Sequence, residues 1–237
     1  MFDKQPGIIV HPTKGHRDGT IANAIIFYME KRGENYKPRF ISRLDMGTSG
    51  VLIVGKNSHA QDNLAKQSEA GSFEKVYFAI LEGNIEDDLP RSGIIDLPIG
   101  RASLGDPRRE VLPETKGGYP SKTEYEIVAT LPGETAVCEH HDIISRADSC
   151  LTVVRVRLIT GRTHQIRVHF SHFGHPVLGD HLYGSQSPLI GRQALHAFET
   201  SFAHPGNGRK MRFIAPFPRD ISDIFGEDFN LKENLTK

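Results

Sequence analysis

The sequence has little of several features that define whole classes of protein. Only two of its 237 residues are cysteine, and none is tryptophan. Cys138 and Cys150 do not make the disulfide framework of a small secreted domain, so that class is excluded. No apolar run approaches the roughly 18 residues of a membrane span, and the N-terminus lacks a secretory signal. We therefore expect a cytoplasmic protein with no membrane partner.

Net charge is also absent, because 29 Lys and Arg balance 29 Asp and Glu. A protein that coats nucleic acid through bulk positive charge is therefore excluded. A local basic face is not excluded, since arginine and histidine crowd residues 155–175 while acidic residues are frequent at 86–88 and 223–228. This balance is compatible with an enzyme that acts on a specific RNA.

The hydrophobic pattern predicts an α+β domain around a mostly antiparallel sheet, because the strands are scattered and the helices are few. Helices are expected at 20–32, 58–70 and 164–173, with Thr20 and Ser58 as N-caps. Strands are expected at 8–10, 51–56, 74–83, 122–130 and 151–159, and as a pair within 194–218. Residues 84–120 are expected to be loop-rich, residues 131–150 to be an irregular, polar connection, and residues 219–237 to be a polar tail with a loose helix.

The first stretch with candidate chemistry is Ile41–Gly50, ISRLDMGTSG. Asp45 stands two residues after Arg43 and shortly before the hydroxyls of Thr48 and Ser49. A cation or a hydrogen-bond donor can hold a carboxylate ionised, as a nucleophile or proton-abstracting base requires. The same residues also fit a surface ion pair that leads into a buried strand, and this stretch alone leaves both interpretations open.

Two further stretches offer side chains suited to nucleic acid. Arg162 lies at an expected helix start, with His164 and Arg167 within one turn. It can bind a phosphate there or pair with a carboxylate such as Asp45, unless these are ordinary solvated charges. Tyr77 lies in the middle of an apolar strand, where it is either a core tyrosine or a platform for a flat base.

Metal and cofactor motifs are not found. Histidines at positions 164, 169, 172, 175 and 181, and the group Cys138, His140, His141 and Cys150, have ligand-like spacings without a specific motif. The chain has neither a P-loop nor a dinucleotide fingerprint. We therefore expect no metal and no cofactor.

Taken in order, these stretches resemble the motifs of the RluA-type pseudouridine synthase family. RLDMGTSG is similar to the catalytic-aspartate motif, and KVYFAILEG to the tyrosine-bearing strand. TGRTHQIRVHFSHFGHPVLGDHLYG resembles the third motif and ALHAF the fourth, while PGIIVHPTKGH and IDLPIGR also look like the family. The resemblance covers Pro6 to Pro218, most of the chain.

The resemblance implies a catalytic domain over residues 1–218, with a long, bent, mixed sheet and an active-site cleft across it. It implies that Asp45 is the catalytic aspartate, that Tyr77 stacks on the target uracil, and that Arg162 pairs with Asp45. Arg43 would enter the space left by the flipped nucleotide. The remaining residues implied to bind substrate are Thr48, His164, Arg167 and Leu195.

The implied function is the isomerisation of specific uridines in ribosomal or transfer RNA by a monomer. Isomerisation exchanges no atoms or electrons with another molecule, so no cofactor is required. Family members usually have another strand before the position at which this chain begins, so we expect that strand to be missing. Two alternatives stay open: a catalytically impaired RNA-binding protein of the same fold, and a metal-dependent hydrolase that uses the histidines.

Overall fold

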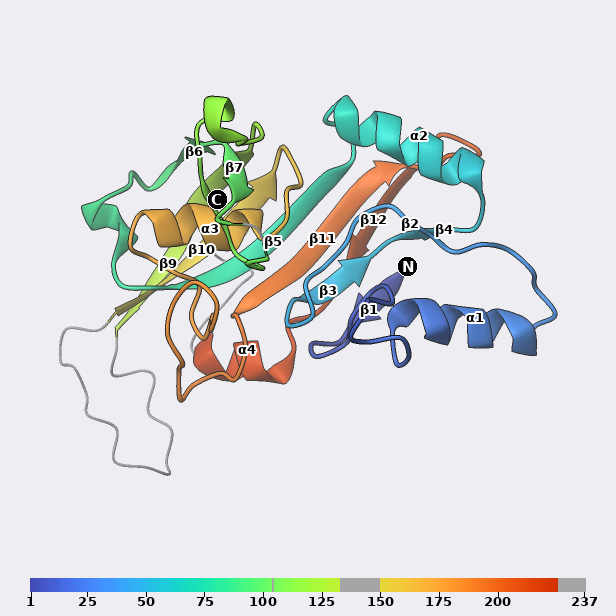
Figure 1. Ribbon diagram of the computed structural model, residues 1–237, viewed down its shortest axis with the longest axis horizontal. Coiled ribbons are helices and arrows are strands. Elements are labelled where there is room, and N and C mark those ends of the chain that lie inside the picture. Colours follow the sequence, from blue (N-terminus) through green and yellow to red (C-terminus); the bar gives the residue numbers. More distant parts are fainter. Residues whose placement is uncertain (104, 133–149, 226–237) are drawn as a thin grey trace. The chain divides into compact units, whose positions relative to one another are not determined.

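A computed structural model describes residues 1–103, 105–132 and 150–225 of the chain (Figure 1). As the sequence predicts, the fold is α+β, with an eight-stranded, mixed, mostly antiparallel sheet and four helices in the described residues. The helices are α1 (Ile21–Lys31), α2 (Ser58–Glu69), α3 (Gln165–His172) and α4 (Arg219–Phe225). None of the helices in these residues is long and apolar enough to cross a membrane.

The large sheet contains both the first and the last strand of the described residues. Its eight strands are β1 (Phe2–Lys4), β3 (Ser49–Leu52), β5 (Glu74–Glu82), β6 (Ser92–Asp96), β9 (Lys122–Pro132), β10 (Cys150–Leu158), β11 (Leu195–Ala203) and β12 (Lys210–Ile214). Two small sheets pair β2 (Arg39–Phe40) with β4 (Val54–Gly55), and β7 (Ile99–Arg101) with β8 (Arg109–Val111). The chain divides into two compact units, which are described separately below.

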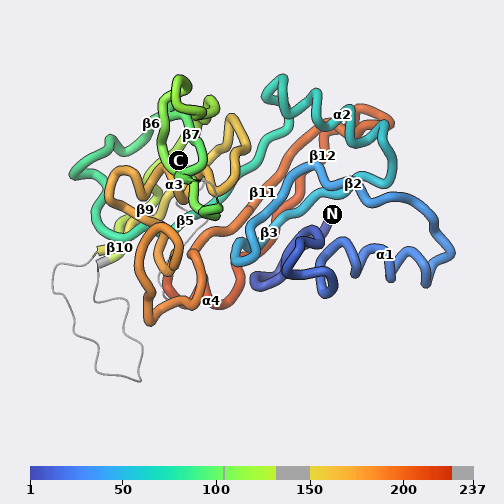
Figure 2. The backbone as a smooth tube through the Cα atoms, viewed as in Figure 1, coloured from blue at the N-terminus to red at the C-terminus, as the bar shows by residue number. Residues whose placement is uncertain are grey.

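The first unit comprises Met1–Val76 and His196–Pro216. Here β3 pairs antiparallel with β1 and parallel with β11, and β12 lies antiparallel along β11. Its core holds the buried residues Val51, Ile53, Leu64, Phe73, Phe202 and Ala215. The backbone tube in Figure 2 shows β3, β11 and β12 running side by side, so the turn that precedes β3 is attached to a packed sheet.

Two expectations for this unit are wrong in detail. No strand forms at residues 8–10, because the carbonyls of Ile9 and Val10 accept the amide hydrogens at the start of α1. The N-terminal strand is Phe2–Lys4 instead. The N-cap of α2 is Asn57, whose side chain accepts a 2.8 Å hydrogen bond from the Ala60 amide, and Ser58 is the first helical residue. Thr20 caps α1 as expected, in a capping box with Asn23.

The second unit comprises Tyr77–Leu195 and Phe217–Lys237. Its strand order is β5-β10-β9-β6, with β9 antiparallel to both β10 and β6. Helix α3 packs on this sheet, where the Phe170 ring meets the Tyr125 ring edge to face at 5.7 Å between centroids. The alternating segments predicted at 74–83, 122–130 and 151–159 are therefore all strands.

Within the loop-rich segment 84–120, the structure has three short strands that the sequence does not predict, β6, β7 and β8. These strands have only three to five residues each, too few for a two-residue period to stand out among prolines and glycines. The expected irregular connection at 131–150 falls mostly outside the described residues, as do Cys138, His140 and His141. Of the polar tail, Arg219–Phe225 is helical and the remainder is not described.

Candidate active site

Asp45 lies in a tight turn that leads into β3. The turn is closed by a 3.1 Å hydrogen bond from the Thr48 amide to the Asp45 carbonyl oxygen. Leu44, immediately before it, is buried, whereas Asp45 is partly exposed and Arg43 is exposed. The apolar side chain therefore anchors the segment while its two charged neighbours stay at the surface.

A buried lysine holds this turn from within the first unit. Lys4 is only 1% exposed, although a lysine is rarely buried without partners. Its ammonium group donates to the carbonyl oxygens of Gln5 at 3.1 Å, Met46 at 2.9 Å and Thr48 at 2.8 Å. Two of these acceptors follow Asp45 directly, so Lys4 fixes the backbone that carries the carboxylate.

The strand after the turn requires a glycine. Gly50 has a φ of +110°, and a Cβ atom built on it would lie 2.1 Å from the carbonyl oxygen of Ala197 in β11. Beside it, the Ser49 hydroxyl and Nδ1 of His196 are 2.9 Å apart, and Nε2 of His196 lies 3.1 Å from the Ala215 carbonyl. Because a carbonyl only accepts, a neutral His196 carries its proton on Nε2 and accepts from Ser49.

Arg43 has a histidine for a neighbour. Burial and then the positive charge of Arg43 lower the pKa of His11. The His11 ring packs against Phe40, with 4.3 Å between the ring centroids. At neutral pH the imidazole is therefore uncharged, and Arg43 supplies the positive charge at this place.

The turn that carries Arg162 is held by one buried glutamine. Gln165 is 2% exposed, and its amide oxygen accepts from the Arg162 amide at 2.9 Å and from the Thr160 hydroxyl at 2.8 Å. Its amide nitrogen donates to the Lys122 carbonyl and to the Thr123 hydroxyl, both at 3.0 Å. All four hydrogen-bonding positions of the side chain are used, so the turn is tied to the end of β9.

Arg162 itself is exposed, and its known contacts lie in the second unit. Its Nε donates to the Pro120 carbonyl at 3.2 Å, and its guanidinium lies over the Tyr119 ring at 5.7 Å from the centroid. The helix it was expected to open begins slightly later, at Gln165, with His164 as N-cap in the left-handed conformation (φ 58°).

His164 and Arg167 belong to one network around Tyr183. Arg167 is 6% exposed and forms a bidentate ion pair with Asp180, through Nε at 2.6 Å and Nη2 at 2.8 Å. The same guanidinium lies 5.0 Å from the centre of the Tyr183 ring. The Tyr183 hydroxyl accepts from the Arg109 amide at 2.8 Å and lies 2.8 Å from Nδ1 of His164. Arg167 is thus buried within the fold.

The other residues expected at the site are buried as well. Tyr77 is 5% exposed within β5, Thr48 is 2% exposed at the end of its turn, and Leu195 is 4% exposed at the start of β11. Asp45, Arg43 and Thr48 belong to the first unit, whereas Tyr77 and Arg162 belong to the second. Their joint action stays a prediction.

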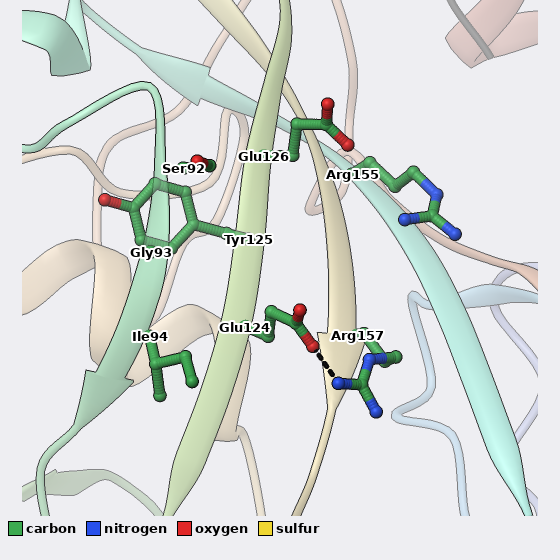
Figure 3. Close-up of a pocket in the computed structure, with 8 residues that line it drawn as sticks. All are labelled: Ser92, Gly93, Ile94, Glu124, Tyr125, Glu126, Arg155 and Arg157. Atoms are coloured by element: carbon green, nitrogen blue, oxygen red, sulfur yellow. Dashed lines mark ion pairs between the residues drawn. The ribbon is translucent and has the colours of Figure 1, made fainter. Parts of the chain in front are cut away.

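A hollow of about 370 Å³ lies on one face of the second unit's sheet (Figure 3). Arg155 and Arg157 of β10 line it beside Glu126 and Glu124 of β9. Arg157 pairs with Glu124, as the dashed line in Figure 3 shows. Arg155 points away from β9 in that view, and within the described residues it forms no ion pair. Its charge is therefore available to an anion.

The arginines of the 101–109 segment also differ in whether a carboxylate is paired with them. Arg108 forms an ion pair with Asp106 at 2.7 Å, and this lowers the pKa of the Asp106 carboxyl, chiefly through the hydrogen bond from Arg108. Arg101 and Arg109 lie opposite each other in the β7–β8 hairpin. Neither has a carboxylate partner in the described part of the chain.

Four of the histidines considered as metal ligands, His164, His169, His175 and His181, lie within hydrogen-bonding distance of another group. His169 is fully buried, with Nδ1 2.8 Å from the Thr123 hydroxyl and Nε2 2.9 Å from the Leu97 carbonyl. Burial lowers the pKa of His169. His175 lies 2.9 Å from Asp88. Over residues 1–103, 105–132 and 150–225, no three His, Cys, Asp or Glu side chains gather as a metal site would require.

Sequence reasoning missed several residues that hold the candidate site together. These are Lys4, Gly50, Gln165, Asp180 and His196. One sequence signal pointed to Asp180, since it follows Gly179 in a tight loop, as a carboxylate that caps turn amides does. The others act through partners far along the chain, which no local pattern shows.

Comparisons with known sequences agree with one another. Residues 1–172 match the family described as RNA pseudouridylate synthase. The chain is 37% identical over 224 residues to the uncharacterized RNA pseudouridine synthase YhcT of Bacillus subtilis, over 94% of this chain and 67% of that protein. It is 32% identical over 240 residues to ribosomal large subunit pseudouridine synthase D of Nitrosomonas europaea, over 98% of this chain and 63% of that protein. The chain thus spans about two thirds of the length of these relatives.

Solved structures show the same fold. The human protein titled RNA pseudouridylate synthase domain containing 1 superposes with a TM-score of 0.66 at 25% identity, over 91% of this chain and 78% of that one. A second human protein, RNA pseudouridylate synthase domain containing 4, gives a TM-score of 0.67 at 20% identity, over 94% and 87%. The second likeness supports the fold alone.

Proposed function

The chain belongs to the RluA-type family of RNA pseudouridine synthases, which are isomerases, and on that premise we propose that it converts specific uridines of ribosomal or transfer RNA to pseudouridine, with Asp45 as the catalytic residue. The observation that carries this proposal is the Asp45 turn. A partly exposed carboxylate lies on a backbone that a buried ammonium group holds in place. Such preorganisation is what a reacting carboxylate needs.

The reaction requires the target base to leave the RNA stack, at a cost of a few kcal/mol. Arg43, which is exposed next to Asp45, occupies the gap that the flipped nucleotide leaves. Tyr77 supports the uracil ring. Arg162 pairs with the Asp45 carboxylate, because an unpaired charge is unfavourable in a site from which water is excluded.

Asp45 then attacks the anomeric carbon or removes a sugar proton, and both routes release uracil from the ribose. The free uracil turns within the pocket and forms the new bond to the sugar through carbon 5, from which a base takes the proton. Every atom of the substrate is retained in the product. The side chains of the site therefore have to bind, orient and move protons only.

The RNA backbone needs cations with no carboxylate partner. Arg155 on the sheet face in Figure 3 has this property, whereas Arg157 and Arg108 are each paired with an acid. We assign Arg155 as a phosphate contact. A monomer acting in the cytoplasm, where these RNAs lie, completes the proposal.

The first test compares Asp45→Asn with Asp62→Asn, an exposed control on α2. Each purified protein is incubated with unmodified cellular RNA, and carbodiimide-resistant uridine adducts are mapped. We expect Asp62→Asn to match the wild type and Asp45→Asn to fold and bind RNA, with a rate at least about a thousandfold lower. Normal modification by Asp45→Asn would refute the assignment. RNA binding by the wild type with no product on any RNA would favour an RNA-binding protein of the same fold.

The proposed pairing of Arg162 with Asp45 has its own readout. Removing the arginine leaves the catalytic carboxylate without its cation, so Arg162→Ala should lower the rate of pseudouridine formation more than the affinity for RNA. Arg162→Lys should keep part of the rate because it keeps the charge. A normal rate in Arg162→Ala would show that Arg162 does not act on Asp45.

A further inference from the structure

A second hollow, of about 310 Å³, lies between the β7–β8 hairpin and helix α3. Its apolar lining comes from Val111, Val168 and Leu182, and Tyr183 forms an aromatic wall. Arg109 and His172 bring polar groups to the same space. Half of the lining residues are polar or charged, so the hollow offers both a surface for packing and groups that can fix a ligand, and its volume is near the lower end of the usual range for ligand pockets.

The aromatic wall is fixed from three sides. Arg167 lies over the Tyr183 ring, the Arg109 amide donates to its hydroxyl, and the hydroxyl lies 2.8 Å from His164. The hydroxyl thus accepts from the Arg109 amide and shares a second hydrogen bond with Nδ1 of His164. Burial raises the pKa of Tyr183, so the phenol keeps its hydrogen at neutral pH. A wall held in this way loses little entropy when a ligand packs on it.

The charges of the hollow suit one phosphate group. Arg108 is already paired with Asp106, which leaves Arg109 as its cation with no carboxylate partner in the described residues. His172 is exposed and lies on α3. Glu110 also lines the hollow, and its negative charge opposes any anion there, so the phosphate has to lie on the Arg109 side.

We propose that this hollow binds one nucleotide of the substrate RNA other than the modified uridine, with its base on the apolar floor and Tyr183 and its phosphate on Arg109. The proposal rests on the proposed function, and none of Asp45, Tyr77 and Arg162 lines the hollow. A base with an apolar face and an adjacent charge fits the combination of aromatic wall and guanidinium. The hollow would then contribute to the choice of RNA without taking part in the reaction.

Three variants separate the effect of the Arg109 charge, the effect of the space in the hollow, and the effect of positive charge outside the hollow. Arg109→Ala removes the guanidinium but keeps the backbone amide that holds Tyr183. Ala102→Phe fills the hollow from its rim without changing charge. Lys116→Ala removes one exposed cation from the segment that follows β8. Lys116 does not line the hollow, so this variant serves as the control. Circular dichroism confirms that each variant is folded.

The probe is fluorescein-labelled octauridylate, and its affinity is measured by anisotropy over a series of KCl concentrations. We expect Arg109→Ala to weaken binding roughly tenfold and to lower the slope of log affinity against log salt by about 0.7, the value for one phosphate of single-stranded RNA. Ala102→Phe should weaken binding with an unchanged slope, and Lys116→Ala should match the wild type. Wild-type affinity in Arg109→Ala and Ala102→Phe, or equal weakening by Arg109→Ala and Lys116→Ala, would overturn the proposal.

A second measurement places the ligand directly. Uridine 5′-monophosphate added to methyl-labelled protein should shift the methyl resonances of Val168 and Leu182, and should not do so in Ala102→Phe. Unshifted resonances at saturation would also overturn the proposal. Both measurements report binding, so they stand apart from the pseudouridine assay. If the wild type forms no pseudouridine, the proposed function fails, whereas a wild type that modifies RNA but shows none of these binding effects refutes this pocket alone.

Discussion

The ammonium group of Lys4 donates a 2.8 Å hydrogen bond to the carbonyl oxygen of Thr48, 44 residues further along the chain. With its second bond to the Met46 carbonyl, this contact ties the first strand to the turn that carries Asp45. A buried cation that serves backbone carbonyls stabilises one conformation of a loop, because moving the loop would leave the charge without partners. The position of the candidate catalytic carboxylate therefore depends on a residue that never has to touch RNA.

Replacing Lys4 by methionine should both destabilise the protein and reduce catalysis. The variant keeps most of the side-chain volume but leaves three carbonyls without their charged donor, so we expect the free energy of unfolding to fall by about 3 kcal/mol. The rate of pseudouridine formation should fall more than the affinity for RNA, since the turn is no longer held. Urea denaturation and the carbodiimide assay measure the two effects. Lys14→Met, at an exposed position, should change neither, and equal behaviour of both variants would contradict the role assigned to Lys4.

Gly50 should not tolerate a side chain. Its φ of +110° is strained for any L-residue, and the new Cβ atom would overlap the carbonyl oxygen of Ala197. Gly50→Ala should therefore part β3 from β11 and lower the free energy of unfolding by at least about 3 kcal/mol. Gly15→Ala is the matched control, because nothing lies within 4 Å of its added Cβ atom. A difference between the two variants of less than about 1 kcal/mol would show that the strands adjust to the methyl group.

The long elements were predictable because their patterns are local. The side-chain pattern of residues 74–82 alternates over nine positions. Thr20 indicates the start of a helix, and in the structure it forms the capping box of α1 with Asn23. The motif around Asp45 could likewise be identified as a candidate site from adjacent residues alone. The short strands β6, β7 and β8 could not be predicted, since each carries too few positions for a pattern, and β6 forms only by pairing with β9, about thirty residues further along.

The partners of charged residues were the harder part. Arg167 and Asp180 stand 13 residues apart, and a sequence shows two charges without showing that they meet in the interior. The resemblance implies that Arg167 binds substrate, and that role stays a prediction beside the observed ion pair. Lys4 gave no signal at all, because two of its three acceptors are carbonyls 42 and 44 residues away.

The buried pair makes a distinct prediction for Arg167. Arg167→Lys keeps a positive charge but loses the bidentate geometry and the contact with the Tyr183 ring. We expect it to lower the free energy of unfolding by about 2–3 kcal/mol. Arg212→Lys breaks the same kind of bidentate pair, with Glu199, at an exposed site, and should cost less than about 1 kcal/mol. A variant Arg167→Lys of normal stability but weakened RNA binding would instead support the original expectation that Arg167 binds substrate.

Stability should fall as the pH falls below the ordinary pKa of histidine, and His169 should be one cause. Burial lowers the pKa of this residue in the folded protein, so between the unfolded and the folded pKa the unfolded chain binds the extra proton. The folded state is then disfavoured by up to about 1.4 kcal/mol per pH unit below about 6.5, and the contribution is absent above that pH.

His169→Gln removes the titrating group. It should be less stable than the wild type at pH 8, since it disturbs the contacts with Thr123 and Leu97, yet its unfolding midpoint in urea should change less between pH 8 and pH 5. His16→Gln, at an exposed position in the first unit, should keep the wild-type dependence. An identical loss of stability on acidification in His169→Gln and His16→Gln would show that other groups, such as His11, govern the acid limb.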